Sequence, residues 1–273
     1  MNIGFRHHQV NKTEYLTIPA FDDTGLVRHC FTTRLGGVST GEWTSLNLGL
    51  NKGDFRDNVI ENYKRICGLI HVDYKKIVFS RQIHGDEIGI ISHEKMAGEL
   101  SFDKALEGLD ALMTDRPGIP LVTFHADCVP LFFLDPVKKA VAVAHSGWRG
   151  TVKKIGKKVI EKMVDIYGCN AGDILAAIGP SIGKCHFEVD EPVADEFLKA
   201  YGDSAYSFIQ GCGTKKFYID LWEACLIQFR ESGINDNNIT LANECTVCHK
   251  DKYFSHRGDA GKTGSLAAMI QLK

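Results

Sequence analysis

The sequence predicts an α/β protein of mixed α+β character, organised as a single layered domain over residues 1–273 with mixed sheets flanked by helices. Segments with helical spacing alternate with short apolar runs along the whole chain, which is typical of layered α/β architectures. The chain has no internal repeat, low-complexity tract or long linker. An apolar content of 44% and a charged content of 24% are those of an ordinary globular protein that can bury a sizeable core.

Charge and hydropathy exclude several classes of partner. With 32 basic and 34 acidic residues, the net charge of −2 gives no electrostatic footprint for nucleic acid and no basic patch for a membrane. No apolar run is long enough to span a bilayer, and the N-terminus lacks the apolar core of a signal peptide. We therefore expect a cytoplasmic protein. Its nine cysteines, an odd number, are expected to be mostly reduced.

The first third of the chain predicts short strands, a loop and one helix. Alternating apolar residues indicate strands within 15–21 and 27–33, and glycines mark a loop over 34–43. A helix is expected to open near Asp57, with Asp57 as its N-cap. Behind it, Ile60, Tyr63 and Cys67 recur at helical spacing.

The middle of the chain predicts buried strands. Residues 76–91 read as a strand, a tight turn at His84 and Gly85, and a second strand. A polar connecting segment, 92–108, leads to a strand at 110–115. Residues 121–151 then contain apolar runs too short for helices and too continuous for half-exposed strands, which predicts two or three fully buried strands.

The second half opens with the clearest helical pattern. Over residues 151–168 an apolar stripe faces a lysine-rich surface, so one continuous helix is predicted; the stripe is Val152, Ile155, Val159, Met163 and Ile166. The remaining expected elements are strands at 174–183, 238–247 and 266–272, helices at 191–202 and 221–233, and a strand just before the second of these helices.

The predicted buried strands of 121–151 carry groups that do metal or acyl chemistry at their ends: His125, Asp127, Cys128, His145 and Arg149. A single buried cysteine or histidine is usually a satisfied core residue. A whole set crowded at strand ends is unfavourable unless its members have partners, so the set indicates a site.

Two chemistries fit this set. Cys128 next to imidazoles could be an activated nucleophile, with Asp127 orienting a base. Alternatively, Cys128 with His84 and His145 could bind zinc or copper. One thiolate and two imidazoles leave a fourth position open, the usual arrangement of a catalytic zinc. The residues alone do not show that the three side chains meet.

Cys245-Thr-Val-Cys248-His249 matches the attachment motif of c-type haem, which normally requires an exported protein. A structural zinc site would need a second ligand pair, and the chain has no second C-x-x-C. We interpret the pair as a chance or structural feature.

Several blocks together resemble one known family. FSRQIHGDEI, LDALMTD, HADCVPLFFLD, VAHSGWRGT, AIGPSIGKCHFEV and the terminal YFSHRGDAGKTGSLAAMI follow in order the blocks of the YfiH/YlmD family. Its members have been described both as laccase-domain multicopper polyphenol oxidoreductases and as purine nucleoside phosphorylases. The resemblance implies an α/β fold related to the deamidating bacterial toxins.

The resemblance also implies an activity and a metal. Zinc, with copper as an alternative, would be held by His84, Cys128 and His145, the trio that the chemistry suggests. The implied activities are phosphorolysis of adenosine, inosine and methylthioadenosine, and adenosine deamination. The partners would be a purine nucleoside and phosphate, and the protein a monomer or small homo-oligomer.

Further roles follow as hypotheses. Asp127 is a candidate proton shuttle for deamination by a metal-activated water. We nominate Arg65, Arg149 and Arg257 for phosphate, because guanidinium matches it bidentately, and Asn47 for the nucleoside. For Arg65, on a predicted helix, surface pairing is an equal alternative.

The chain departs from the family pattern at three places. His125 stands where threonine is usual and could be a fourth ligand or a base. Lys184, Cys185 and His186 replace Pro-Cys-Cys, and Gly264 to Ala267 lacks the usual basic residue, which weakens phosphate recognition by that segment.

Three other functions compete with this one. A multicopper phenol oxidase needs recurring H-x-H pairs, and the chain has none. In a cysteine amidohydrolase Cys128 would be the nucleophile and His145 its base. A non-catalytic accessory protein would turn over no nucleoside.

Overall fold

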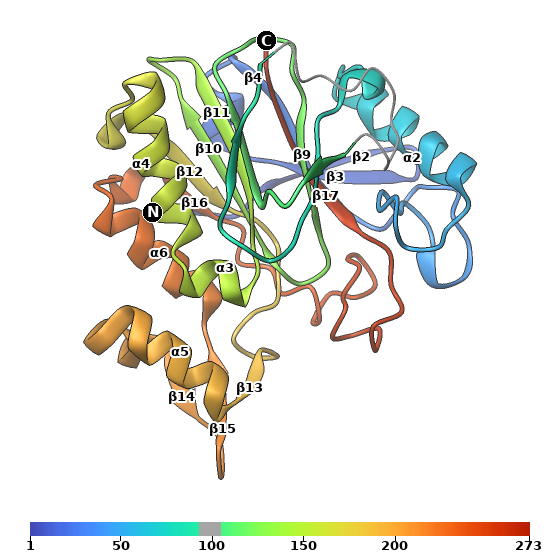
Figure 1. Cartoon of the computed structure of the whole chain (residues 1–273). Helices are drawn as coiled ribbons and strands as arrows, with labels where there is room; N and C mark the ends of the chain where they lie inside the picture. Colours follow the sequence, from blue (N-terminus) through green and yellow to red (C-terminus); the bar gives the residue numbers. More distant parts are fainter. Residues whose placement is uncertain (93–104) are drawn as a thin grey trace.

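Two β-sheets packed face to face form the centre of the molecule, with helices on both outer sides (Figure 1). The structure is a computed structural model and describes residues 1–92 and 105–273. Most of the polar connection expected over 92–108 lies outside the described residues.

The first sheet has seven strands in the order β1-β16-β12-β10-β11-β8-β6. Their bounds are Asn2–Ile3, Ile239–Leu241, Leu175–Ile178, Val129–Asp135, Ala140–Ser146, Ala111–Thr114 and Ile88–Ile90. β10 is antiparallel to both of its neighbours, whereas β12 and β16 run parallel, so the sheet is mixed.

The second sheet has five strands in the order β2-β3-β4-β17-β9. Their bounds are Arg6–Val10, Thr13–Thr17, Val27–Thr32, Leu266–Leu272 and Leu121–His125. A smaller, three-stranded sheet has the order β13-β15-β14, with bounds Glu188–Asp190, Lys216–Ile219 and Ile209–Gly211. A two-stranded sheet pairs β5 (Ser80–Arg81) with β7 (Leu106–Glu107).

The α-helices lie on the outer faces and below the sheets (Figure 1). They are α1 (Pro19–Asp22), α2 (Arg56–Leu69), α3 (Trp148–Val152), α4 (Ile155–Tyr167), α5 (Glu191–Tyr201) and α6 (Leu221–Glu231). Short 3₁₀ turns occupy Gly41–Trp43, Tyr74–Lys76, Ala171–Asp173, Gly202–Ser207 and Asp236–Asn238. No helix of the described residues is long and apolar enough to cross a membrane.

Burial on both faces explains the continuous apolar runs of the sequence. In β10, Leu131 and Phe133 pack toward α4 and α6, and Phe132 and Leu134 pack between the two sheets. In β17, Ala268 and Ile270 line this inter-sheet core, whereas Ala267 and Met269 pack toward α2. Because successive strand residues point to opposite faces, each central strand needs apolar residues throughout.

The predicted fold class is confirmed, and the expected strands within 121–151 are β9, β10 and β11. The division into domains stays a prediction. Residues 76–91 form β5 and β6, which belong to different sheets and do not pair with each other.

Two helix predictions were wrong in detail. The helix expected over 151–168 is broken at Lys154, whose φ of 58° lies in the left-handed region and separates α3 from α4. Ile166, assigned to the apolar stripe, is 50% exposed. Phe55, not Asp57, is the N-cap of α2; Asp57 lies in the first turn, where a carboxylate stabilises the helix dipole.

Candidate metal centre and active-site pocket

His84, Cys128 and His145 come together, although they lie far apart in the sequence. Each offers one ligand atom, and these atoms all lie within 4.8 Å of one another. The imidazole rings of His84 and His145 meet edge to face, with centroids 4.8 Å apart. The geometry therefore brings together the three residues that the sequence nominated.

Strand pairing explains how two of them meet. β10 and β11 are antiparallel, and Val129 pairs with Ser146. Cys128, just before β10, therefore lies across from Gly147, just after β11, and beside His145. A Cβ atom on Gly147 would stand 3.2 Å from the Cys128 Sγ and 3.0 Å from the His84 Cδ2, so glycine allows the two side chains to approach without displacement.

The third residue comes from the loop between β5 and β6. His84 has a φ of 60°, an uncommon conformation for a residue other than glycine. Asp110 supports this loop, because its buried carboxylate accepts hydrogen bonds from the backbone N–H groups of Ile83, His84 and Gly85 at 3.1, 3.0 and 2.7 Å.

Asp110 also orients His145. Its Oδ1 accepts a hydrogen bond from the His145 Nδ1 at 2.8 Å. This leaves the His145 Nε2 as the free ligand atom, the carboxylate–histidine arrangement that commonly supports metal ligands. Burial favours the neutral acid, but the hydrogen bonds from His145 and the loop backbone lower the pKa of Asp110.

The electrostatics of the trio favour a thiolate. Burial alone would raise the pKa of Cys128, but the charges and hydrogen bonds of His145 and His84 lower this pKa to about 6. Burial alone would lower the pKa of His145, and the Cys128 sulfur and Asp110 raise it to about 9. A thiolate and two imidazoles with a supporting carboxylate fit zinc or copper.

The trio lies at the wall of a cavity of about 520 Å³. Phe124, Trp148 and Phe187 contribute aromatic surface, and Lys52, Arg81 and Arg257 are the cations among the residues that line it. A cavity of this size that combines apolar and aromatic surface with polar side chains is typical of small-molecule sites.

His125 also lines the cavity, next to His145, but it is not part of the ligand cluster. Its Nε2 lies 2.8 Å from the Thr123 hydroxyl, and its Nδ1 lies 3.0 Å from the Cys128 carbonyl oxygen. With both ring nitrogens hydrogen-bonded, His125 is a buried support of the Cys128 loop. Burial and the neighbouring His145 lower the pKa of His125 well below its usual value.

Asp127 lines the cavity in a left-handed conformation, with a φ of 86°. One carboxylate oxygen accepts a hydrogen bond from the Thr246 hydroxyl at 2.6 Å, and the other from the Arg257 backbone N–H at 2.6 Å. Asp127 thus fastens two loops to the cavity wall.

Among the arginines nominated from sequence, Arg257 alone lines the cavity. Its guanidinium donates to the carbonyl oxygens of His186 and Glu188 at 2.9 and 3.2 Å. Arg65 instead forms an ion pair with Glu61 on α2 at 3.1 Å, which is the surface pairing given above as the alternative to phosphate binding. Arg149 is exposed and stacks over the Trp148 ring.

The structure places Asn47 outside the cavity lining, fully buried. Its amide accepts hydrogen bonds from the backbone N–H groups of Gly49 and Ser265 and donates to Asp54. Asn47 therefore organises its own loop rather than offering groups to a ligand.

Sequence reasoning missed Asp110, Lys52 and Arg81. Asp110 carried a signal, since a carboxylate beginning the apolar run DALMT is unfavourable without partners. Lys52 and Arg81 lie in segments with no such pattern, and only the folded chain brings them to the cavity.

Comparison with known proteins places the chain in a family. Residues 28–273 match the family model described as multi-copper polyphenol oxidoreductase laccase. The chain is 35% identical over 244 residues to the purine nucleoside phosphorylase YlmD of Bacillus subtilis, covering 89% of this chain and 87% of that protein. It is 32% identical over 257 residues to the purine nucleoside phosphorylase YfiH of Escherichia coli, covering 94% and 98%.

Two solved structures resemble this chain over nearly its whole length. A YfiH protein from Bacillus licheniformis, described as hypothetical, superposes with a TM-score of 0.93 at 34% identity and covers 98% of this chain and 99% of its own. YlmD from Geobacillus stearothermophilus superposes with a TM-score of 0.92 at 31% identity, covering 98% of each. From its sequence and its fold alike, the chain belongs to the YfiH/YlmD family of laccase-domain proteins.

Proposed function

We propose that this protein is a zinc-dependent purine nucleoside phosphorylase. A phosphate oxygen forms a bond to the ribose C1′, the C1′–N9 bond breaks, and the purine leaves with its electron pair and takes up a proton. The products are the free base and ribose 1-phosphate. The observation that carries the proposal is the His84–Cys128–His145 trio in the wall of a cavity that also presents aromatic and cationic groups. Relatives similar over most of the chain are named as such phosphorylases.

The cavity residues divide into two groups by chemistry. The flat faces of Phe124, Phe187 and Trp148 suit a purine ring. For phosphate, the cavity lining favours Lys52, Arg81 and Arg257 over Arg65 and Arg149, which lie outside it. Burial lowers the pKa of Lys52, whose charge is favoured by the nearby Cys128 sulfur. A phosphate bound next to Lys52 would favour the charged form of its amine further.

Zinc is the metal that we assign to the trio, because three N/S ligands in a protein cavity match catalytic zinc sites. When bound, it supplies Lewis-acid stabilisation of negative charge on a substrate oxygen or nitrogen. The chain's own residues do the positioning: Asp110 holds His145, and Gly147 allows the sulfur and both imidazoles to approach.

Adenosine deamination is a second candidate, favoured by Asp127. Water would add at C6 and ammonia would leave, which needs a group that moves a proton. Asp127 is the one carboxylate among the described residues that line the cavity. Both Asp127 oxygens already accept hydrogen bonds, from Thr246 and from the Arg257 backbone. To transfer a proton, Asp127 must therefore break one of these bonds and contact the substrate instead.

The alternatives from other classes have less support. Neither of the two candidate metal clusters in the described residues contains the three or more histidines of a trinuclear copper centre. A cysteine amidohydrolase remains chemically coherent, because Cys128 and His145 form a thiolate–imidazolium pair without a metal. We place the protein in the cytoplasm, as a monomer or small homo-oligomer.

The test incubates purified protein with inosine, adenosine and methylthioadenosine, with and without phosphate. Phosphate-dependent release of base with formation of ribose 1-phosphate is expected, and inosine appearing from adenosine reports deamination. Cys128→Ala should lose the zinc of the trio and the activity, whereas Cys212→Ala, at an exposed cysteine outside the cavity, should keep both. Full turnover by Cys128→Ala would show that the active site lies elsewhere.

Cys128→Ser separates the metal hypothesis from the nucleophile hypothesis. A serine hydroxyl is a poor zinc ligand, so the metal hypothesis predicts loss of the zinc at the trio along with activity. If Cys128 is instead a nucleophile and no metal is involved, the wild type should be active in a chelator, and iodoacetamide should abolish that activity.

A further inference from the structure

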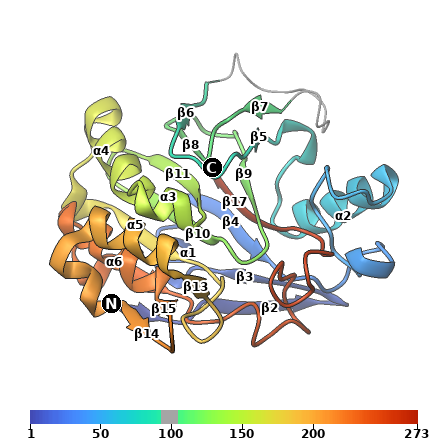
Figure 2. The same cartoon turned by 60° about the horizontal axis from the view of Figure 1, so that its bottom comes forward.

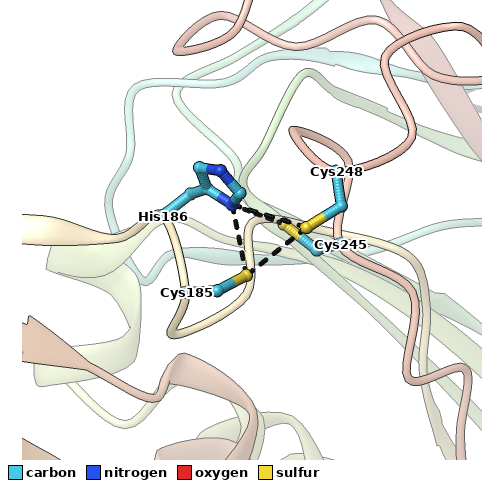
Figure 3. A group of neighbouring side chains, drawn as sticks. All are labelled: Cys185, His186, Cys245 and Cys248. Atoms are coloured by element: carbon cyan, nitrogen blue, oxygen red, sulfur yellow. Dashed lines mark hydrogen bonds between the residues drawn. The ribbon is translucent and has the colours of Figure 1, made fainter.

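A second cluster of metal-binding side chains lies outside the cavity. Cys185, His186, Cys245 and Cys248 each present one ligand atom, and all four atoms lie within 4.8 Å of one another (Figure 3). None of the four residues lines the cavity. We propose that this cluster is a structural zinc site with a complete Cys₃His ligand set.

The distances within the cluster match those of tetrahedral zinc. With zinc–sulfur bonds of about 2.3 Å and zinc–nitrogen bonds of about 2.0–2.1 Å, two sulfurs should lie about 3.7 Å apart and a sulfur and a nitrogen about 3.5 Å apart. The Sγ atoms of Cys185 and Cys248 are 3.6 Å apart. The His186 Nδ1 lies 3.2, 3.6 and 3.5 Å from the sulfurs of Cys185, Cys245 and Cys248. These four distances match the expected ones, and the two remaining sulfur–sulfur distances lie within 4.8 Å.

Sheet topology brings the two halves of the cluster together. β12 and β16 are parallel neighbours (Figure 1), so the loops that follow them leave the same edge of the sheet. The segment that leads to β13 and the segment that leads to β17 both lie toward the bottom of Figure 2. The backbones of these loops continue the pairing: Ser181 donates to Glu244, and Thr246 donates to Ser181, at 3.2 and 3.0 Å. Cys185 and His186 in the first loop thus meet the Cys245-x-x-Cys248 knuckle in the second.

The surroundings of the sulfurs are those of thiolate ligands rather than of a disulfide. The Gly183 backbone N–H donates to the Cys245 Sγ at 3.2 Å, a hydrogen bond of the kind that supports metal-bound thiolates. The separation of 3.6 Å between Cys185 and Cys248 is far longer than the bond of about 2.05 Å in a disulfide. A disulfide would also use only two of the four side chains of the cluster, and would leave the other two without a partner of this kind. A closed set of four protein ligands leaves no position for substrate, which characterises structural sites.

The cluster would stabilise the cavity wall. Arg257 donates to the carbonyl oxygens of His186 and Glu188, and Thr246, between the two knuckle cysteines, donates to Asp127. Because Arg257 and Asp127 line the cavity, a metal that fixes residues 185–186 to 245–248 holds this side of the cavity in place.

The test counts zinc per chain by mass spectrometry in protein purified from zinc-supplemented cells. We expect two zinc ions in the wild type and one in Cys128→Ala, which retains the complete second cluster. Cys248→Ser should also retain one, and the double variant none. Cys212→Ser is the matched control at another exposed cysteine and should keep both.

Two further measurements use Cys128→Ala, in which the second cluster is intact, so they depend neither on enzymatic activity nor on whether a variant of the cluster folds. In Cys128→Ala, a strong chelator should remove the remaining zinc and lower the melting temperature, and added zinc should restore it. Cobalt loaded into the same variant should show thiolate-to-cobalt charge-transfer absorption. No zinc in Cys128→Ala, iron in its place, or a Cys185–Cys248 disulfide in freshly purified protein would each overturn the proposal. Failure of the phosphorylase assay would leave these metal counts unchanged.

Discussion

The Asp110 carboxylate accepts the Nδ1 hydrogen of His145 at 2.8 Å while it also holds the backbone of the His84 loop. One buried side chain thus sets the tautomer of one expected metal ligand and the position of another.

Replacing Asp110 should weaken metal binding without removing a ligand. An amide in Asp110→Asn presents one oxygen where the carboxylate presents two, so it cannot hold both His145 and the 83–85 backbone. Losses of this kind typically cost about 10–100-fold in metal affinity. Competition with a chromogenic chelator measures the affinity. The control is Asp115→Asn, whose carboxylate pairs with Arg116 at the surface and should leave the affinity unchanged.

Adding one methyl group at Gly147 should disrupt the trio. The new Cβ of Gly147→Ala would stand 3.0 Å from the His84 Cδ2 and 3.2 Å from the Cys128 Sγ, so at least one of these side chains must move. The affinity of the trio for zinc and phosphate-dependent turnover should both fall at least tenfold, and total zinc should drop toward the one ion held by the second cluster. Gly68→Ala is the matched control: its Cβ meets no atom within 4 Å on the exposed side of α2, and it should stabilise the helix by about 0.5–1 kcal/mol. Normal zinc content in Gly147→Ala would contradict the packing argument.

The reactivity of Cys128 in metal-free protein should report its pKa. A thiolate reacts with iodoacetamide and a thiol does not, so labelling should rise with pH around a midpoint near 6. In His145→Gln the imidazole charge and its hydrogen bond to the sulfur are absent, burial weighs more, and the midpoint should shift upward. Mass-spectrometric labelling of the Cys128 peptide measures both curves. Coincident curves would show that His145 does not set the ionisation.

Folding stability should fall in mild acid because of His29. Its Nε2 accepts a hydrogen bond from the Ile18 backbone N–H at 2.7 Å, which requires the neutral ring. Burial lowers the pKa of His29 to about 4, partly offset by Asp22. The folded state thus binds fewer protons than the unfolded state between about pH 6.5 and pH 4, and the free energy of unfolding decreases as the pH falls through this window, by roughly 3 kcal/mol.

His29→Gln tests this assignment, because its side-chain oxygen can still accept the Ile18 hydrogen bond but does not titrate. Urea unfolding between pH 7 and pH 4 should show a shallower pH dependence for the variant than for the wild type. Parallel curves would mean that other groups cause the acid sensitivity.

Short-range patterns in the sequence predicted the buried strands and the amphipathic helices. Runs such as VPLFFL are apolar at every position because both faces of the strand are buried, and this is visible without a structure. The break at Lys154 was not predictable in this way, because the apolar stripe continues across it and one residue in a left-handed conformation leaves no pattern in composition.

For the site, the sequence by itself determined the types of residue: a thiol and imidazoles at strand ends, and a C-x-x-C pair that it could not place. Only the tertiary structure decided which of them meet. Lys52 and Arg81 line the cavity, and Asp110 supports the trio beside it, whereas Asn47 and Arg65 lie outside the cavity lining. Cys185 and His186 lie next to the Cys245-x-x-Cys248 knuckle, about 60 residues later in the chain. The physical reason is that ligand geometry depends on contacts between distant segments. The pairing of β12 with β16, and the hydrogen bonds of Asp110 to residues 83–85, are contacts that local sequence does not encode.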